Sequence, residues 1–205
     1  MYLLGFVQLC QTVPARGFSE RLGVSAAVRQ HRLASPADLK CVVCDVLEAT
    51  VGPVDGIASG MAYRAARHGE LGEIPLACAA LSSERLPEPL RLASLDAGQR
   101  LWDLSRRWDW ARAVHEQLDD FAHRHDLHHA VAFGALVSET TAQQVRAIAG
   151  YLWNVARGIV EAGVRLIPLP EEDGQHVLSD VQPTIAQLAA RCVDKHADDI
   201  AVRGE

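Results

Sequence analysis

Apolar residues recur three and four positions apart along most of this chain, and segments that alternate apolar with polar residues are nearly absent. The pattern is clearest between residues 140 and 160. Its apolar positions there are Val145, Ile148, Ala149, Leu152, Val155, Ala156 and Ile159. This spacing places the apolar side chains on one face of an α-helix. The sequence therefore predicts an all-α fold, a single-domain helical bundle of about eight to ten helices.

A second helix start is marked by the four residues Ser35-Pro36-Ala37-Asp38. The serine can cap the helix, the proline suits the first helical position, and the aspartate lies three residues after the cap. We expect this helix to continue to about Val51. The pair Gly52-Pro53 is expected to end it.

The remaining boundaries follow from glycine, proline and local polarity. Further helices are expected over residues 55–68, which Gly69 closes, over residues 90–108 and over residues 183–193. Extended structure is expected only in the first ten residues and over residues 164–169. The helical domain is predicted to span residues 1–193, and the polar residues 194–205 are predicted to form a loose tail.

The charge of the chain argues against two classes of partner. Lys and Arg total 20 and Asp and Glu total 26, which leaves a net charge of −6. A nucleic-acid binder or a protein of anionic membrane surfaces normally carries a basic excess, so neither partner is expected. No apolar run reaches the roughly 20 residues that span a bilayer, and no secretory signal is evident. We therefore expect a cytoplasmic protein.

Motifs of several common enzyme classes are missing from the sequence. A phosphate-binding loop requires G-x-x-x-x-G-K-[ST], whereas Lys40 and Lys195 are the only lysines and neither lies in such a motif. Cys41-Val42-Val43-Cys44 has no second ligand pair for a structural zinc site. These two thiols are predicted to be buried in the core, since free cysteine is among the most buried residue types.

A histidine-rich segment supports an alternative function. Five histidines lie close together in the sequence: His115, His123, His125, His128 and His129. On one continuous helix, His125 and His129 would share a face and could chelate nickel or zinc. The sequence offers no obvious third and fourth ligand. The alternative function is thus a helical metal-binding protein or enzyme that uses the His115–His129 cluster. The simpler interpretation of the same segment is a polar helix end that happens to be rich in histidine.

Several blocks resemble the urease accessory protein UreF family. Residues 9–23 read LCQTVPARGFSERLG and resemble its N-terminal signature, roughly L-x-x-x-x-L-P-x-G-G-[FY]-[ST]-x-S-x-G-L-E. Ala132-Phe133-Gly134, Gly150-Tyr151-Leu152-Trp153 and the run EAGVRLIPL at 161–169 follow in the order and spacing of the family. The resemblance extends from about Leu3 to about Ala190.

The chain departs from the family pattern at several positions. Arg16 stands where the signature has its second glycine, and Pro170-Glu171 stand where the family has Gly-Gln. The usual closing R-L-F-x-S is replaced by a different C-terminal sequence. Because that tail contacts partners in the family, its divergence bears on how the D-type accessory protein is bound.

The resemblance implies a non-enzymatic maturation factor that is needed for nickel incorporation into apo-urease. Such a factor bridges the D-type accessory protein, also called UreD or UreH, and the GTPase UreG, and it is expected to be a homodimer. No cofactor is expected to bind stably, because the whole complex handles the nickel. The missing phosphate-binding loop agrees with this, since the GTPase holds the nucleotide.

The resemblance also implies a set of partner-binding residues. They are Gly17, Phe18, Ser19, Gly23, Tyr151, Arg165 and Gln175. Each has a simpler interpretation beside it: the glycines can serve turns, Arg165 can extend from an apolar run to solvent, and Gln175 can bond locally. Tyr151 and Trp153 are two positions apart and face different sides of a helix. One is therefore expected in the core and the other at an interface.

Overall fold

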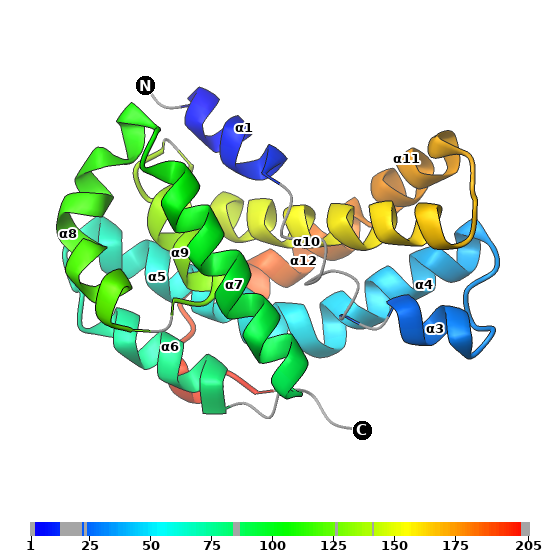
Figure 1. Cartoon of the computed structure of the whole chain (residues 1–205), viewed down its shortest axis with the longest axis horizontal. Helices are drawn as coiled ribbons and strands as arrows, with labels where there is room; N and C mark the ends of the chain where they lie inside the picture. The colour runs from blue at the N-terminus through cyan, green and yellow to red at the C-terminus, as the bar shows by residue number, and fades with distance from the viewer. Residues whose placement is uncertain are drawn as a thin grey trace.

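The computed structural model describes residues 3–12, 22, 24–83, 87–125, 127–140 and 142–201, and every regular element in these ranges is helical (Figure 1). This confirms the predicted all-α fold. The elements are α1 (Leu3–Gln11), α3 (Ser25–Arg29), α4 (Pro36–Val46), η2 (Leu47–Gly56), α5 (Ile57–His68), α6 (Glu73–Ser83), α7 (Glu88–Ser105), η3 (Asp109–Ala111), α8 (Arg112–Arg124), α9 (His129–Val137), α10 (Gln144–Leu166), α11 (Glu171–Asp180), α12 (Gln182–Cys192) and η4 (Ala197–Asp199).

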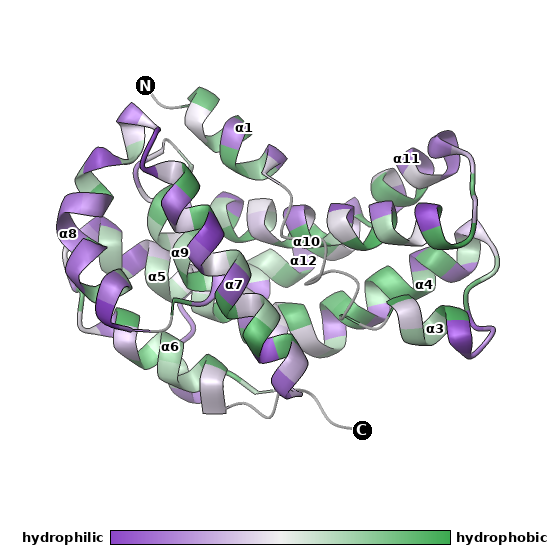
Figure 2. Cartoon of the chain, in the orientation of Figure 1, coloured by the Kyte–Doolittle hydropathy of each residue, from purple (hydrophilic) through white to green (hydrophobic). Residues whose placement is uncertain are grey.

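Helix α10 forms the axis of the bundle. Its 23 residues extend about 35 Å, and it contacts α1, α4, α5, α9, α11, α12 and η2. Most of its predicted apolar face is buried, whereas Val145 and Ala149 are half-buried. In Figure 2, hydrophilic residues are frequent on α8, whereas α9 is largely hydrophobic.

The first predicted helix boundary is confirmed at its start but is wrong at its end. Ser35 caps α4 by accepting a hydrogen bond from the Asp38 amide, with a nitrogen–oxygen distance of 3.2 Å. The chain does not leave the helix at Gly52-Pro53 but continues as the π-helix η2 into α5. The wider π-helical turn accommodates the proline ring, which would clash with a carbonyl in a regular α-helix.

Glycine at position 52 also allows α12 to pack against this π-helical stretch. A Cβ atom there would lie 2.8 Å from the Leu47 carbonyl oxygen and 3.2 Å from the Leu188 side chain. The thiol of Cys192 donates to the Gly52 carbonyl at 3.2 Å. The irregular turn is therefore held by contacts between η2 and α12, which no local sequence signal reveals.

Other boundaries agree with the sequence more closely. Gly69 ends α5 with a left-handed backbone (φ +76°), as predicted, because glycine has no Cβ to oppose this conformation. Helices α7 and α12 correspond to the helices predicted over residues 90–108 and 183–193. The predicted extended segments are wrong. Residues 3–11 form α1, and the run that begins at residue 164 completes the last turn of α10.

The predicted loose tail packs onto the bundle as far as the structure describes it. Ile200 is buried, and the Arg64 guanidinium donates to the Lys195 carbonyl oxygen at 2.5 Å. The prediction of two buried thiols in the C-x-x-C motif also needs correction, because Cys41 is exposed and Cys44 is half-buried on α4. Among the described helices, none combines the length and apolar character needed to cross a bilayer.

Gly134 provides a test of the packing of α9 on α5. A Cβ atom at this position would lie 2.1 Å from the Ser59 carbonyl oxygen, and backbone cannot give way cheaply. We expect Gly134→Ala to lower the free energy of unfolding by about 1–3 kcal/mol despite the better helix propensity of alanine. Urea denaturation would measure this difference.

The matched control is Gly72→Ala, since a Cβ atom there meets nothing within 4 Å. This control should leave the free energy of unfolding unchanged within about 0.5 kcal/mol. Equal stability of the two variants would contradict the described contact between α5 and α9.

Candidate partner-binding surface

Helix α1 contains no charged residue and packs closely against α10. The close approach occurs at Gly150, where a Cβ atom would lie 2.9 Å from both the Cys10 sulfur and the ring of Phe6. Burial raises the pKa of the Cys10 thiol to about 11, although the nearby Arg157 charge opposes the shift. Close apolar contact at Gly150 therefore contributes to the packing of α1 on the bundle.

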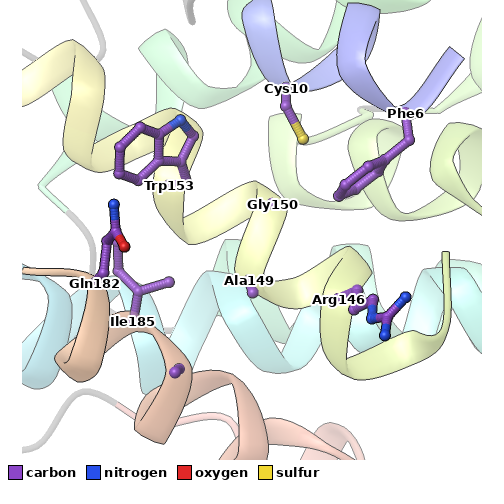
Figure 3. Close-up of a pocket in the computed structure, with 9 residues that line it drawn as sticks. Phe6, Cys10, Arg146, Ala149, Gly150, Trp153, Gln182 and Ile185 are labelled. Atoms are coloured by element: carbon purple, nitrogen blue, oxygen red, sulfur yellow. The ribbon is translucent and has the colours of Figure 1, made fainter. Parts of the chain in front are cut away.

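An open groove of about 510 Å³ lies where α1, α10 and α12 meet (Figure 3). Its apolar lining includes Phe6 and Cys10 of α1, Trp153 of α10 and Ile185 of α12. The other lining residues are Arg146, Ala149, Gly150, Gln182 and Ala186. Apolar walls with one arginine and one glutamine suit a hydrophobic partner surface rather than a charged small molecule.

An apolar ridge stands beside this groove on the outer face of α1. It consists of Leu3, Leu4 and Val7, whose exposed fractions are 63%, 81% and 41%. Apolar side chains gathered on one short helix next to an apolar groove are typical of a protein–protein contact surface. The ridge and the groove together are called the α1 face below.

The structure separates the residues that the sequence proposed for partner binding. Gly17, Phe18, Ser19 and Gly23 lie outside the described residues. The described segment before them ends at Thr12, directly after α1.

Tyr151 is buried, which corrects its assignment as a partner contact. Its side chain is fully enclosed, and its hydroxyl donates to Asp55 Oδ1 at 3.1 Å, joining α10 to η2. Its neighbour Trp153 faces the groove instead. One of the two aromatic residues thus lies in the core and the other on the surface, and the surface residue is Trp153 rather than Tyr151.

Burial dominates the electrostatics of this Tyr–Asp pair. It raises the pKa of the Asp55 carboxyl to about 7, although the hydrogen bond from Tyr151 opposes the shift. Burial and the neighbouring carboxylate together hold the pKa of Tyr151 well above its usual value. A buried carboxylate with one side-chain donor costs free energy whenever it is ionised.

Arg165 and Gln175 lie at the other end of the molecule. Arg165 is exposed in the last turn of α10, and Gln175 is exposed on α11. Twelve residues of helix separate Arg165 from Trp153, or about 18 Å along the axis. The chain therefore presents two distinct surfaces, the α1 face and the end formed by α10 and α11 (Figure 1).

A family model for UreF matches residues 33–182, which is well over half of the chain. The chain belongs to the UreF family. It is 24% identical to the urease accessory protein UreF of Actinobacillus pleuropneumoniae serotype 3 (strain JL03), over 91% of this chain and 83% of the relative. It is 28% identical to UreF of Rhodopseudomonas palustris (strain TIE-1), over 94% of this chain and 79% of the relative.

Membership of the UreF family confirms the resemblance drawn from the sequence and the expectation of an accessory protein that is not an enzyme. The matched region begins after the N-terminal signature and ends at the first residue of α12. It therefore includes Trp153, Arg165 and Gln175, whereas α1 and the loop after it precede it.

The two histidines proposed as an alternative metal site lie in different surroundings in this UreF fold. His125 follows the end of α8, is exposed and stacks on Phe121 with 4.6 Å between ring centroids. His129 begins α9 and is buried beside Phe133 and Tyr151. No continuous helix joins them, and the described residues contain no group of three His, Cys, Asp or Glu side chains placed to hold a metal ion.

A third histidine belongs to a network that sequence analysis missed. His115 contacts Ser105 Oγ at 2.9 Å and Asp119 Oδ1 at 3.0 Å, in the order serine, histidine, aspartate. Ser105 is fully buried and donates to the Trp102 carbonyl oxygen at 2.8 Å. Burial alone would raise the pKa of Asp119, but hydrogen bonds from Arg106, His115 and Trp102 lower it to about 2. The network joins α7 to α8 and is structural.

The buried Asp55 predicts a pH-dependent stability for this UreF chain. Its folded-state pKa of about 7 exceeds its ordinary value, so the folded chain holds a proton that the unfolded chain has lost. Stability from this group is present at low pH and is lost as the pH rises from about 4 to about 7. The slope approaches about 1.4 kcal/mol per pH unit in that window.

Asp55→Asn removes this ionisation while keeping an oxygen that can accept from Tyr151. Relative to the wild type, we expect the variant to gain at least about 1.4 kcal/mol of stability between pH 5 and pH 8, measured by urea denaturation. Burial lowers the pKa of His129 to about 4, so this group makes stability rise with pH. Because His129 is present in both the wild type and the variant, its effect cancels in the difference between them. The exposed Asp96→Asn should show no such gain, and a pH-independent difference for Asp55→Asn would contradict the assignment.

Proposed function

We propose that this chain is a urease accessory protein needed for nickel incorporation into apo-urease, and that it acts by bridging the D/H-type accessory protein and the GTPase UreG. Family membership supports the urease connection. The described surface supports a role in binding proteins, because it carries an open apolar groove with an adjacent apolar ridge. Nickel is carried by the assembly, and no stably bound cofactor is invoked. We place this activity in the cytoplasm.

The α1 face is the observation that supports this proposal, because it offers both an apolar ridge and an apolar groove. A convex apolar ridge of Leu3, Leu4 and Val7 lies beside a concave apolar groove that contains Trp153. In a two-fold symmetric dimer, each ridge can enter the groove of the other copy, so that both features are covered at once. The sequence resemblance implies a homodimer. We propose that this homodimer forms through the α1 face.

The second surface remains available to the accessory partners in such a dimer. Arg165 and Gln175 lie at the end formed by α10 and α11, away from the α1 face. A guanidinium there can bind a carboxylate of the D-type protein or of the GTPase in a bidentate manner. The loop that carries Phe18 is proposed to contribute an aromatic anchor to the same assembly.

Leu4→Asp tests the proposed dimer. Leu4 is 81% exposed in the isolated chain, so the substitution should leave the fold intact while placing a charge in the interface. We expect at least tenfold weaker dimerisation by analytical ultracentrifugation. Leu76→Asp is the matched control, because Leu76 is 52% exposed on α6. Equal dimerisation of the two variants would contradict this interface.

Co-elution tests the bridging role. The chain should form a stable ternary peak with the D-type protein and the GTPase in size-exclusion chromatography with GTP and nickel present. Arg165→Glu should weaken the binding of at least one partner by about tenfold or more, because a charge-assisted contact becomes repulsive. Arg107→Glu, an exposed charge reversal just after α7, should have no effect. The proposal fails if the wild-type chain joins neither folded partner.

A further inference from the structure

The C-terminal end of α1 is held by contacts from within the helix end and from α10. The last carbonyl groups of any helix have no partner within the helix and must be satisfied elsewhere. At this end of α1 the Thr12 hydroxyl donates to the Gln8 carbonyl at 3.0 Å, and the Thr12 amide donates to the Leu9 carbonyl at 3.1 Å. The remaining carbonyls turn toward α10.

Two side chains of α10 satisfy three consecutive carbonyls at this end. Asn154 donates from Nδ2 to the Cys10 carbonyl at 3.2 Å and also to the Thr12 carbonyl. Arg157 donates from Nη2 to the Gln11 carbonyl at 2.7 Å. The two side chains are three residues apart and therefore lie on one face of α10.

The surroundings of both side chains strengthen these bonds. Asn154 is fully buried, and a bond made in such surroundings is strengthened by the low local dielectric constant. Arg157 pairs through Nε with Glu161 Oε1 at 3.1 Å, one turn further along α10, and its side chain is only 21% exposed. The fixed guanidinium makes a charge-assisted hydrogen bond, which is the stronger kind.

The other end of α1 is held by a different contact. Trp110 packs against Gly5, where a Cβ atom would lie 2.9 Å from its indole ring. Its Nε1 donates to Gln8 Oε1 at 3.1 Å. A helix of nine residues is not stable alone in water, so its position depends on such external contacts.

We propose that Asn154 and Arg157 form a clamp that positions α1, and that the clamp thereby controls dimerisation without touching the second copy. This inference rests on the proposed dimer through the α1 face. The ridge of Leu3, Leu4 and Val7 is presented to a partner only while α1 stays seated on α10. Loss of the clamp frees three carbonyls and lets α1, together with its ridge, leave its position on α10.

Hydrogen exchange of residues 3–12 tests the clamp directly. Asn154→Asp keeps the size of the side chain but removes its N–H donors, and Arg157→Ala removes the guanidinium. We expect each variant to exchange the amides of α1 at least tenfold faster at a concentration where the chain is monomeric, while the amides of α9 keep their wild-type rates. Arg157→Lys should restore part of the protection, because an ammonium can still donate to the Gln11 carbonyl.

Dimer dissociation constants measured on the same variants complete the test. Dimerisation should weaken at least tenfold in Asn154→Asp and Arg157→Ala, but not in the control Arg100→Ala, which only removes an exposed pair with Asp96. Leu4→Asp should weaken the dimer while leaving the hydrogen exchange of the α1 amides unchanged. This difference distinguishes a residue that contacts the second copy from residues that position α1.

Two outcomes would overturn the clamp. Unchanged exchange in α1 would show that the two side chains do not hold it, and faster exchange spread over α9 and α10 would show a general loss of folding. If the wild-type chain is monomeric at every concentration, the proposed dimer fails instead. The exchange rates of α1 then still decide whether Asn154 and Arg157 hold this helix.

Discussion

The rest of the structure depends on helix α10. One side of this helix is buried in the core, and α1 packs against another side. Its inner residues, such as Ile148, Leu152 and Val155, are fully enclosed by α5, α9 and η2. The same helix presents Gly150, Asn154 and Arg157 to α1. One rigid helix thus sets both the core and the candidate interface, and a change in its rotation would move both together.

The elements that the sequence predicts well are those decided by local chemistry. The cap at Ser35 and the left-handed glycine at Gly69 act within one turn of chain, so neighbouring residues suffice to predict them. Pro53 is different, because the π-helical turn that accepts it is stabilised by α12, which is distant in sequence. Helix α1 is different for the same reason, since its apolar run becomes helical against α10.

The sequence constrains the positions of individual site residues less than it constrains the fold. Periodicity shows that Tyr151 and Trp153 face different sides of α10, but it does not show which side is covered. That choice depends on η2, where Asp55 accepts the Tyr151 hydroxyl and draws it into the core. Likewise, the spacing of His125 and His129 suggests a shared face, yet the chain leaves the helix at His125 and begins a new one at His129.

A bridging protein must bind one partner without hiding the surface that another partner needs. In this chain the α1 face and the α10–α11 end lie on one helix but about 18 Å apart along it, so two partners can contact the same rigid element. Side chains of α10 that belong to neither surface hold α1 in place. The affinity of the proposed dimer could therefore be changed through Asn154 and Arg157 while the apolar contact residues stay the same.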